Sequence, residues 1–504
     1  MLRRNNALTR GPRRGIDGGL VDLVTDWLRR RAAYHPERPA LRFRDATWSF
    51  GELDGATDRV AAALRAEGLG PGDRVAVLAE NHPAFVTLLA ATARTGVVLA
   101  PLNTRLAAAE LAELLVHTAP RLLLHGPRFE ERARAAAGAI PVRALEGFDA
   151  AADGAASYEA APDDVATLCF TGGTTGLPKG AMLAHRQLVM NAVNTAFGWG
   201  LGERDAVVVA TPMFHAAFHA LAWPLLQLGG FVVVQERFDP EKHLALSAEH
   251  ATLLFMVPTM FRLLADAPGF ASADLGRVRW AISGGAPCPA PIREAFAARG
   301  IRFKQGYGLT ECGVNCFALG LDEAAAHPES VGRPMPHLHA RLVNDAGDEA
   351  DEGELQLSGP VTMRGYFGRD AATAEAFVEA GGRRWLRTGD IARRDAAGRY
   401  FIVGRKKEMF ISGGENVYPA EVERALGTHP AVHECAVVGV PDPRWGEVGL
   451  AAVALHPGAT ADEATLKAHV TERLAKYKVP KRWRFLDALP KSGAGKILKR
   501  ELID

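Results

Sequence analysis

The sequence predicts an α/β protein with two unequal domains. The larger, N-terminal domain is expected to hold parallel-rich sheets covered by helices, with a smaller β-barrel-like part, and the C-terminal domain to be a small, mobile α+β unit. Short apolar runs alternate with alanine-rich helical stretches along most of the chain, which is typical of parallel sheets covered by helices. The pattern changes where an apolar strand ends in the basic cluster Arg405-Lys406-Lys407. A chain of 504 residues, 48% of them hydrophobic, is long enough for two or more domains.

Local patterns predict the elements of the larger domain. An amphipathic helix is expected to begin at Leu20 and to end before His35-Pro36, because apolar residues recur there at helical spacing. The alanine-rich and acidic stretch 150–161 is predicted to be a solvated surface loop. Strands are predicted at the short apolar runs 75–78, 97–99, 122–124, 165–170, 206–210, 231–234 and 253–257.

The C-terminal part carries its own elements and is predicted to fold as a compact lid. Strands are expected at 436–440 and 450–454 and a helix at 462–474, within about 100 residues, a typical domain size. No apolar segment follows the arginines near the N-terminus, so that region is predicted to be a disordered basic tail and no targeting signal. The expected boundaries are therefore 1–19 for the tail, 20–404 for the large domain and 405–504 for the lid.

Composition excludes several classes of function. Fifty-nine basic and 58 acidic residues give a net charge of +1, so no overall field attracts nucleic acid or an anionic membrane. No stretch approaches the roughly 18 to 20 apolar residues that span a bilayer. The five cysteines are too few and odd in number for a disulfide framework, which fits a reducing cytoplasm. Cys312 and Cys316 make a poor metal site, because no second Cys/His pair has suitable spacing.

The segment 170–180, Phe-Thr-Gly-Gly-Thr-Thr-Gly-Leu-Pro-Lys-Gly, predicts a phosphate-binding loop after a strand. Glycines let backbone N–H groups converge on an anion, and the threonine hydroxyls and the lysine add donors and charge. A glycine- and threonine-rich cluster by itself is usually a surface turn. A Walker loop is excluded, because the lysine lies between Pro178 and Gly180. The predicted phosphate-binding residues are Thr171, Gly172, Gly173, Thr174, Thr175, Gly176 and Lys179.

This string resembles the phosphate loop of the adenylate-forming family, which includes acyl-CoA synthetases, peptide-synthetase adenylation domains and luciferases. The family loop usually reads Thr-Ser-Gly-Thr-Thr-Gly-x-Pro-Lys-Gly, and Gly172 stands where serine is commoner, a departure that some fatty-acid-activating members share. The resemblance extends from Leu41 to Ile497, with further motifs in family order. It implies an acid–thiol ligase of the acyl-CoA synthetase branch, in which ATP and a carboxylic acid give an acyl-adenylate and CoA then displaces AMP. ATP, Mg²⁺ and CoA are the ligands that it implies.

The resemblance also assigns nucleotide and metal contacts. Tyr307, Thr310 and Glu311 match the family's Tyr-Gly-x-Thr-Glu motif, in which the tyrosine offers an aromatic face, the threonine a phosphate donor and the glutamate an oxygen ligand for Mg²⁺. Asp390 in Thr-Gly-Asp is suited to paired ribose hydroxyls, and Arg405 matches an arginine that contacts ribose or phosphate. Each short motif alone would be no more than a turn. The adenine-side loop is matched by Gly284, Gly285 and Ala286.

The lid carries three further expectations that rest on the resemblance. Lys496, in a Gly-Lys-Ile segment, would bridge the carboxylate and the α-phosphate and stabilise charge on the reacting phosphorus. Lys407 occupies the pivot position about which the small domain rotates between the two steps. Gly413 and Gly414 would line the pantetheine tunnel of CoA, although a hairpin turn would also explain them.

The acid pocket is less clearly specified. Phe214, His215, Phe218 and Gly306 are predicted to line it, and His215 is assigned substrate contact without proton transfer, because a histidine in such a run is usually a packing residue. The acid is expected to be hydrophobic, either fatty or aromatic. Adenylation followed by transfer to a carrier protein or an amine, and activation of an oxyanion such as nitrite, are the alternatives. A catalytically silent nucleotide-binding scaffold and a P-loop NTPase are more distant ones. The expected partner is a small carboxylic acid, with an acyl carrier protein as the alternative acceptor, and the expected state is a cytoplasmic monomer or homodimer.

Overall fold

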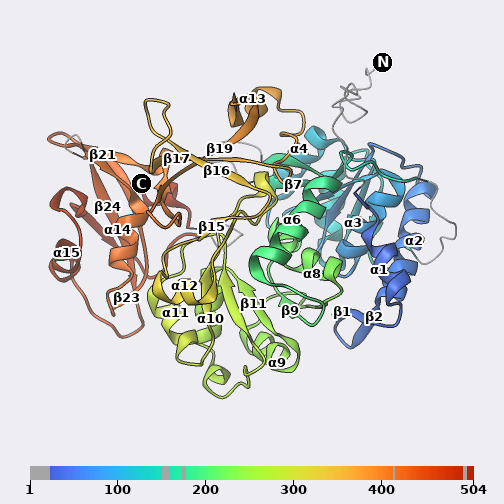
Figure 1. Ribbon diagram of the computed structural model, residues 1–504, viewed down its shortest axis with the longest axis horizontal. Coiled ribbons are helices and arrows are strands. Elements are labelled where there is room, and N and C mark those ends of the chain that lie inside the picture. The colour runs from blue at the N-terminus through green and yellow to red at the C-terminus, as the bar shows by residue number, and fades with distance from the viewer. Residues whose placement is uncertain (1–22, 150–157, 172–177, 413–414, 492–496, 504) are drawn as a thin grey trace.

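The computed structural model describes residues 23–149, 158–171, 178–412, 415–491 and 497–503. Its strands form two parallel-rich sheets, an antiparallel sheet, a two-stranded pair and the sheet of a C-terminal unit (Figure 1). The predicted fold class, mixed α/β with parallel-rich sheets and a small C-terminal unit, is confirmed. Within these ranges no helix is both long and apolar enough to cross a lipid bilayer.

The first parallel-rich sheet contains the two strands on either side of the predicted phosphate loop. All neighbouring strands are parallel except the last pair, β7 and β8, which flank that loop. In order across the sheet the strands are β6 (Val142–Ala144), β5 (Leu122–His125), β3 (Arg74–Leu78), β4 (Val98–Pro101), β7 (Val165–Thr171) and β8 (Lys179–Ala184). The helices of this part are α1 (Trp27–Tyr34), α2 (Phe50–Ala66), α3 (Ala84–Thr95), α4 (Ala108–Thr118), α5 (Glu130–Ala137) and α6 (His185–Trp199), with η1 (Pro127–Phe129).

The second parallel-rich sheet shares a core with the first. One buried apolar cluster contains Leu99 of the first sheet and Val207 of the second, which joins the two sheets into a single unit. In order its strands are β13 (Phe303–Gln305), β12 (Trp280–Ser283), β11 (Leu253–Met256), β9 (Ala206–Val209), β10 (Phe231–Val234), β1 (Pro39–Phe43) and β2 (Ala46–Ser49). Its helices are α7 (Ala217–Ala220), α8 (Ala222–Leu228), α9 (Pro240–His250), α10 (Pro258–Ala265), α11 (Ala290–Ala297) and α12 (Leu321–Ala326), with η2 (Pro268–Ala271) and η3 (Thr310–Cys312).

The smaller β part of the large unit is an antiparallel sheet between the parallel sheets and the C-terminal unit (Figure 1). Its strands are β16 (His339–Val343), β17 (Glu352–Ser358), β19 (Arg383–Arg394) and β18 (Phe377–Ala380), with β20 (Tyr400–Arg405) paired to β19. The pair β14 (Phe317–Ala318) and β15 (Arg333–Pro334) and the helix α13 (Asp370–Ala376) accompany it.

The C-terminal unit has a sheet and a core of its own. Val437, Ala451 and Val453 are buried between this sheet and its helices. Its strands are β22 (Glu415–Val417), β21 (Phe410–Ser412), β24 (Gly446–Leu455) and β23 (Val432–Asp442), with β25 (Arg482–Phe485) parallel to β24. Its helices are α14 (Pro419–Leu426) and α15 (Glu463–Thr471), with η4 (Lys406–Glu408), η5 (Lys476–Lys478) and η6 (Lys499–Leu502).

Two local predictions need correction. The first helix begins at Trp27 and not at Leu20, because the Asp26 carboxylate caps it by accepting from the backbone N–H of Arg29 at 3.2 Å. Ala160, at the end of the predicted solvated loop, is buried, and its carbonyl accepts from the Thr25 hydroxyl at 3.0 Å. The predicted tail 1–19, residues 20–22 and the segment 150–157 lie outside the described residues.

Candidate active site

Three of the predicted nucleotide-binding residues meet at one buried carboxylate, that of Asp390. The register of β19 and β20 places Asp390 opposite Arg405, and the Arg405 Nε lies 2.6 Å from the Asp390 Oδ1. The Tyr307 hydroxyl donates to the Asp390 Oδ2 at 2.5 Å. Asp390 is 3% exposed, so these partners hold a carboxylate that little water reaches.

The charges around this group keep Arg405 and Tyr307 protonated. Burial opposes the charge of Arg405, but Asp390 and the neighbouring acidic groups together outweigh it, so the pKa of Arg405 is raised. Burial, together with the negative charge of Asp390, raises the pKa of Tyr307 well above its usual range. Tyr307 therefore remains a hydroxyl that donates to Asp390.

A second polar group joins the phosphate loop to the Tyr-Gly-x-Thr-Glu motif. The Tyr366 hydroxyl donates to the Glu311 Oε1 at 2.9 Å, and the Lys179 Nζ lies 5.0 Å from the centroid of the Tyr366 ring. Burial and the neighbouring Glu311 charge raise the pKa of Tyr366, which keeps its hydroxyl protonated. Tyr366 thus links a predicted phosphate ligand to a predicted metal ligand. No sequence motif identified it.

The predicted adenine-side turn lies beside Gly306. A Cβ on Gly306 would lie 2.9 Å from the Ser283 carbonyl oxygen, which accepts from the Gly306 N–H at 2.8 Å, so only glycine fits this approach. The Gln305 side chain accepts from the Cys288 N–H at 2.9 Å and donates to the Ala286 carbonyl at 3.2 Å. Gln305, which sequence reasoning missed, therefore ties the turn 284–286 to the strand that leads into Tyr307.

The loop that carries Thr310 and Glu311 is closed on itself. The Cys316 N–H donates to the Tyr307 carbonyl at 3.1 Å, and the Val314 N–H donates to the Leu309 carbonyl at 3.2 Å. Val314 has a φ of 88°, and a β-branched residue in that region costs on the order of 1–3 kcal/mol. A Cβ on Gly308 would overlap the carbonyl oxygen of Val314. The conformation of Val314 therefore requires glycine at position 308.

The predicted acid-binding residues follow β9 and lead into α7. Phe214 and Phe218 are buried, and the ring centroids of Phe214 and His215 are 4.5 Å apart. The side chain of Asn81 supports this segment. It donates to the carbonyls of Thr211 at 3.1 Å and Gln235 at 3.0 Å, and it accepts from the Met213 N–H at 2.8 Å. Asn81 also had no sequence signal, because it is a single amide after an apolar strand.

Several predicted site residues lie outside the described residues. They are Gly172, Gly173, Thr174, Thr175 and Gly176 of the phosphate loop, Gly413 and Gly414 of the CoA tunnel, and Lys496. Their flanks are described: Thr171 pairs with Lys179, Ser412 pairs with Glu415, and Lys491 bridges to Ile497. In the part of the chain that the structure describes, no group of three or more His, Cys, Asp and Glu residues is arranged to hold a metal ion.

The predicted pivot Lys407 lies in η4, between the last strand of the antiparallel sheet and the first strand of the C-terminal sheet. Burial, then the positive charge of Arg405, lower the pKa of Lys407. Nearby, Glu329 lies between two cations, with the Arg293 Nη2 at 2.6 Å and the Arg424 Nε at 3.3 Å. Arg424 belongs to α14, so this exposed ion pair crosses between the two units.

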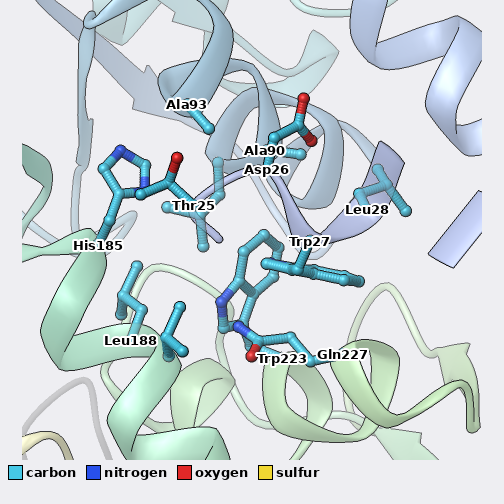
Figure 2. Close-up of a pocket in the computed structure, with 12 residues that line it drawn as sticks. Thr25, Asp26, Trp27, Leu28, Ala90, Ala93, His185, Leu188, Trp223 and Gln227 are labelled. Carbon is cyan, nitrogen blue, oxygen red and sulfur yellow. The ribbon is translucent and has the colours of Figure 1, made fainter. Parts of the chain in front are cut away.

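A small, partly open cavity lies elsewhere, between the segment 25–28 and the helices α3, α6 and α8 (Figure 2). Thr25, Trp27, His185 and Trp223 are among the residues that line it, and none of the predicted site residues does. Burial lowers the pKa of His185 to about 4, so this histidine is neutral at pH 7. The cavity is therefore part of the packing at the start of α6 and is separate from the candidate site.

Comparison with known proteins gives matches over almost the whole chain. Residues 28–367 match the family model described as AMP-binding enzyme, and residues 421–496 match the AMP-binding enzyme C-terminal domain. A feruloyl-CoA synthase of Amycolatopsis sp is 42% identical over 482 residues, which cover 94% of this chain and 97% of that protein. A fatty acid–acyl-carrier-protein ligase of Streptomyces coeruleorubidus is 34% identical over 507 residues, 94% of each chain.

Solved structures of similar proteins extend this result. The o-succinylbenzoate CoA synthetase of Bacillus subtilis in complex with its acyl-adenylate intermediate has a TM-score of 0.86 and 32% sequence identity, covering 95% of this chain and 98% of that one. The same enzyme in complex with ATP and a magnesium ion has a TM-score of 0.85 at 32% identity, covering 95% and 99%.

Proposed function

This chain belongs to the AMP-binding enzyme family, and from that premise we propose that it activates an aromatic carboxylic acid with ATP and transfers the acyl group to CoA. The predicted reaction class, AMP-forming ligation of a carboxylic acid to CoA, is confirmed by the family and by its CoA-ligase relatives. ATP, Mg²⁺ and CoA as ligands are consistent with those relatives. The identity of the acid and the roles of individual residues are the proposed part.

The observation that carries the nucleotide assignment is the buried carboxylate of Asp390, held between Tyr307 and Arg405. One oxygen of Asp390 faces Arg405 and the other accepts from Tyr307, so the orientation of the carboxylate is fixed. A carboxylate only accepts hydrogen bonds, which suits the paired hydroxyls of a ribose. A site oriented in advance binds a nucleotide without a further cost of ordering.

At the phosphate end, Lys179 would place its charge beside the polyphosphate while Glu311 would hold the metal ion. Bound Mg²⁺ supplies neutralisation of phosphate charge. The described residues offer Glu311 and no cluster of carboxylates, which suits an ion that keeps several waters and takes phosphate oxygens as ligands. The Tyr366 hydroxyl donates to Glu311 and so orients the carboxylate. Thr310, in the same turn, would donate to a phosphate oxygen.

The aromatic acid is proposed from the segment 211–222 and from the relatives. This segment contains no Asp, Glu, Lys or Arg, and the rings of Phe214 and Phe218 lie within it next to small alanines. Such a surface suits an acid with a flat, uncharged body. Feruloyl-CoA synthase and o-succinylbenzoate CoA synthetase both act on aromatic acids, which supports this class over a fatty acid. His215 would contact the substrate without transferring a proton.

A basic aromatic surface on the C-terminal unit supports CoA as the acceptor. Trp445 is 38% exposed, and its ring lies 3.8 Å from the Lys481 Nζ and 4.8 Å from the Arg444 Cζ. It adjoins Gly446, which pairs with Ser412 next to the predicted pantetheine tunnel. An indole between two cations suits the adenine and phosphates of CoA.

We further propose that the large domain ends at residue 404 and the lid begins at residue 405. The lid rotates about Lys407, and Lys496 contacts the carboxylate and the α-phosphate when the lid is closed. The protein is a cytoplasmic monomer or homodimer.

A panel of carboxylic acids assayed for pyrophosphate release with and without CoA tests this function. Hydroxycinnamic and arylacetic acids should give both acyl-AMP and acyl-CoA, whereas medium-chain fatty acids should give little of either. Trp445→Ala should raise the KM for CoA about threefold to tenfold and leave ATP–pyrophosphate exchange unchanged, since cation–π and stacking contacts contribute about 0.5–1.5 kcal/mol. Acyl transfer to an acyl carrier protein in place of CoA would favour the alternative acceptor. Turnover of fatty acids alone would refute the aromatic assignment.

A further inference from the structure

Helix α6 connects the two sides of the candidate site through buried amides. It follows β8 and therefore the phosphate loop, and it carries Asn191 and Thr195 one turn apart on a buried face. The Asn191 Nδ2 donates to the carbonyl of His219 in α7, on the acid side, at 2.8 Å. The Asn191 Oδ1 accepts from the Asn315 N–H, on the nucleotide side, at 3.3 Å. One side chain of α6 thus contacts both segments.

Asn315 completes this connection. Its Nδ2 donates to the Thr195 Oγ1 at 2.8 Å and to the Ala220 carbonyl at 2.5 Å, so it binds α6 and the end of α7 together. Asn315 is buried, so these bonds are made away from solvent. None of the sequence motifs includes it, and neither the nucleotide nor the acid assignment above uses it.

The residue before Asn315 explains why so many bonds converge there. Val314 lies in the left-handed region with φ of 88°, and its carbonyl occupies the space that a side chain at position 308 would need. A strained residue persists only where its surroundings over-determine it. The bonds of Asn315 supply that constraint on one side, and the Val314 N–H bond to the Leu309 carbonyl supplies it on the other.

We propose that Asn315 is a positioning residue for adenylation. By holding Val314 against Gly308, it fixes the loop 307–316, and with it Tyr307, Thr310 and Glu311, at a set position relative to the acid-side helix α7. The proposal rests on the proposed function, because it assumes that the nucleotide binds at this loop and the acid beside α7. If Asn315 is removed, Val314 is free to relax to negative φ, and the loop shifts away from α7.

Asn315→Ala tests this role against a matched control on α6. It should lower kcat for ATP–pyrophosphate exchange about 10- to 100-fold, as expected when two buried hydrogen bonds are lost and the reacting groups are misplaced. Asn194→Ala is the control, because Asn194 is equally buried on α6 but accepts from the His337 N–H at 2.9 Å, away from the loop. It should lower the melting temperature and leave kcat within about twofold of wild type.

A second substitution distinguishes positioning from simple destabilisation. Glycine adopts positive φ without strain, so in Val314→Gly/Asn315→Ala the loop has no strain to release. We expect the double variant to recover at least about fivefold in kcat over Asn315→Ala, a non-additive effect typical of coupled neighbours. Val→Gly restores none of the hydrogen bonds of Asn315, so a loss of kcat caused by those bonds alone would not be rescued, and a recovery due only to stability would appear as an equal recovery of the melting temperature.

Two results would overturn the proposal. They are equal kcat values for Asn315→Ala and Asn194→Ala, and a double variant no faster than Asn315→Ala. The thermal shift induced by AMP provides a readout that does not need the acid, and Asn315→Ala should reduce it by more than half. A wild-type enzyme that is stabilised by AMP but turns over no aromatic acid would refute the proposed substrate class. The AMP shift of the variants would still decide the role of Asn315.

Discussion

The nucleotide side and the acid side of the candidate site are held by different kinds of contact. On the nucleotide side, polar side chains bind one another: the Asp390 carboxylate lies between the Tyr307 hydroxyl and the Arg405 guanidinium. On the acid side, the neutral amide of Asn81 binds backbone groups, and the segment it supports is apolar. The nucleotide is charged and can be bound by charged side chains at fixed positions. The uncharged body of the acid is bound by a surface of matching shape. The difference predicts that each side fails in its own way.

The largest effect is expected from Asp390→Asn, which removes the charge on the nucleotide side. Asparagine keeps the size of the side chain but leaves Arg405 without its carboxylate. Because hydrogen bonds to charged groups contribute about 1.5–3 kcal/mol each, kcat/KM for ATP should fall at least about 100-fold. The KM for the acid should change little. ATP–pyrophosphate exchange at varied ATP concentration measures both.

The control for this change is Asp351→Asn. Asp351 pairs with Arg394 at 2.8 Å in the same sheet, but its side chain is 78% exposed, so its loss should have no measurable effect on catalysis. A fall of less than threefold for Asp390→Asn would show that the buried carboxylate does not bind the nucleotide.

The next effect is expected from Asn81→Ala, which breaks the acid side. Three hydrogen bonds to the segment before α7 and to the end of β10 are lost, so the KM for the acid should rise about tenfold and the melting temperature should fall. The KM for ATP should stay within about twofold, since the Asp390 group is untouched. Equal increases in both KM values would mean that Asn81 supports the fold and not the acid side.

A smaller effect is expected from Tyr366→Phe, which tests the phosphate end of the nucleotide side. The ring that lies under Lys179 is kept, but the hydrogen bond to Glu311 is lost. The Mg²⁺ concentration for half-maximal activity should rise about threefold to tenfold, because Glu311 is no longer oriented. Tyr400→Phe is a suitable control, since its hydroxyl donates to the Ala340 carbonyl at 3.4 Å and lies beside Arg394, and neither is a predicted site residue. An unchanged Mg²⁺ requirement in Tyr366→Phe would argue against Glu311 as the ligand.

The last and smallest effect is expected from pH, and it concerns the stability of the acid side and not catalysis. It tests whether the acid side is uncharged. Burial lowers the pKa of His219, beside Phe218, to about 4, compared with about 6.5 in the unfolded chain. The stability that comes from keeping this histidine neutral is therefore complete above about pH 6.5 and is lost as the pH falls towards 4. For each buried histidine of this kind, lowering the pH from 7 to 5 should reduce the free energy of unfolding by about 2 kcal/mol.

Urea unfolding of wild type and His219→Gln at these two pH values checks this expectation. The difference between the two pH values should be smaller by about 2 kcal/mol in the variant. The histidines His185 and His243, also with pKa values of about 4, should keep contributing in both proteins. An identical pH dependence in the two proteins would mean that His219 is not held neutral in the folded state.

Much of the nucleotide side can be predicted from the sequence, because its residues occur in recognisable strings. Such strings predict Tyr307, Asp390 and Arg405 as nucleotide ligands, and the three side chains lie in one group in the folded protein. Tyr366, Gln305 and Asn81 cannot be found in this way, because they are single polar residues without a motif. Their roles depend on partners far along the chain, such as Glu311 for Tyr366. The predicted start of α1 was wrong, because the cap at Asp26 competes with an apolar pattern that extends further back.

By itself the sequence determined the fold class and the reaction class, and it predicted the residues of the nucleotide side. The fold class follows from hydrophobic periodicity, and the reaction class from the resemblance of the glycine-, hydroxyl- and charge-bearing strings to those of the adenylate-forming family. Both patterns are local properties of the chain. Only the tertiary structure decided that Asp390 lies between Tyr307 and Arg405, and that Asn315 holds Val314 against Gly308. Strand register and packing set those distances, and both arise from contacts between residues that are remote in sequence.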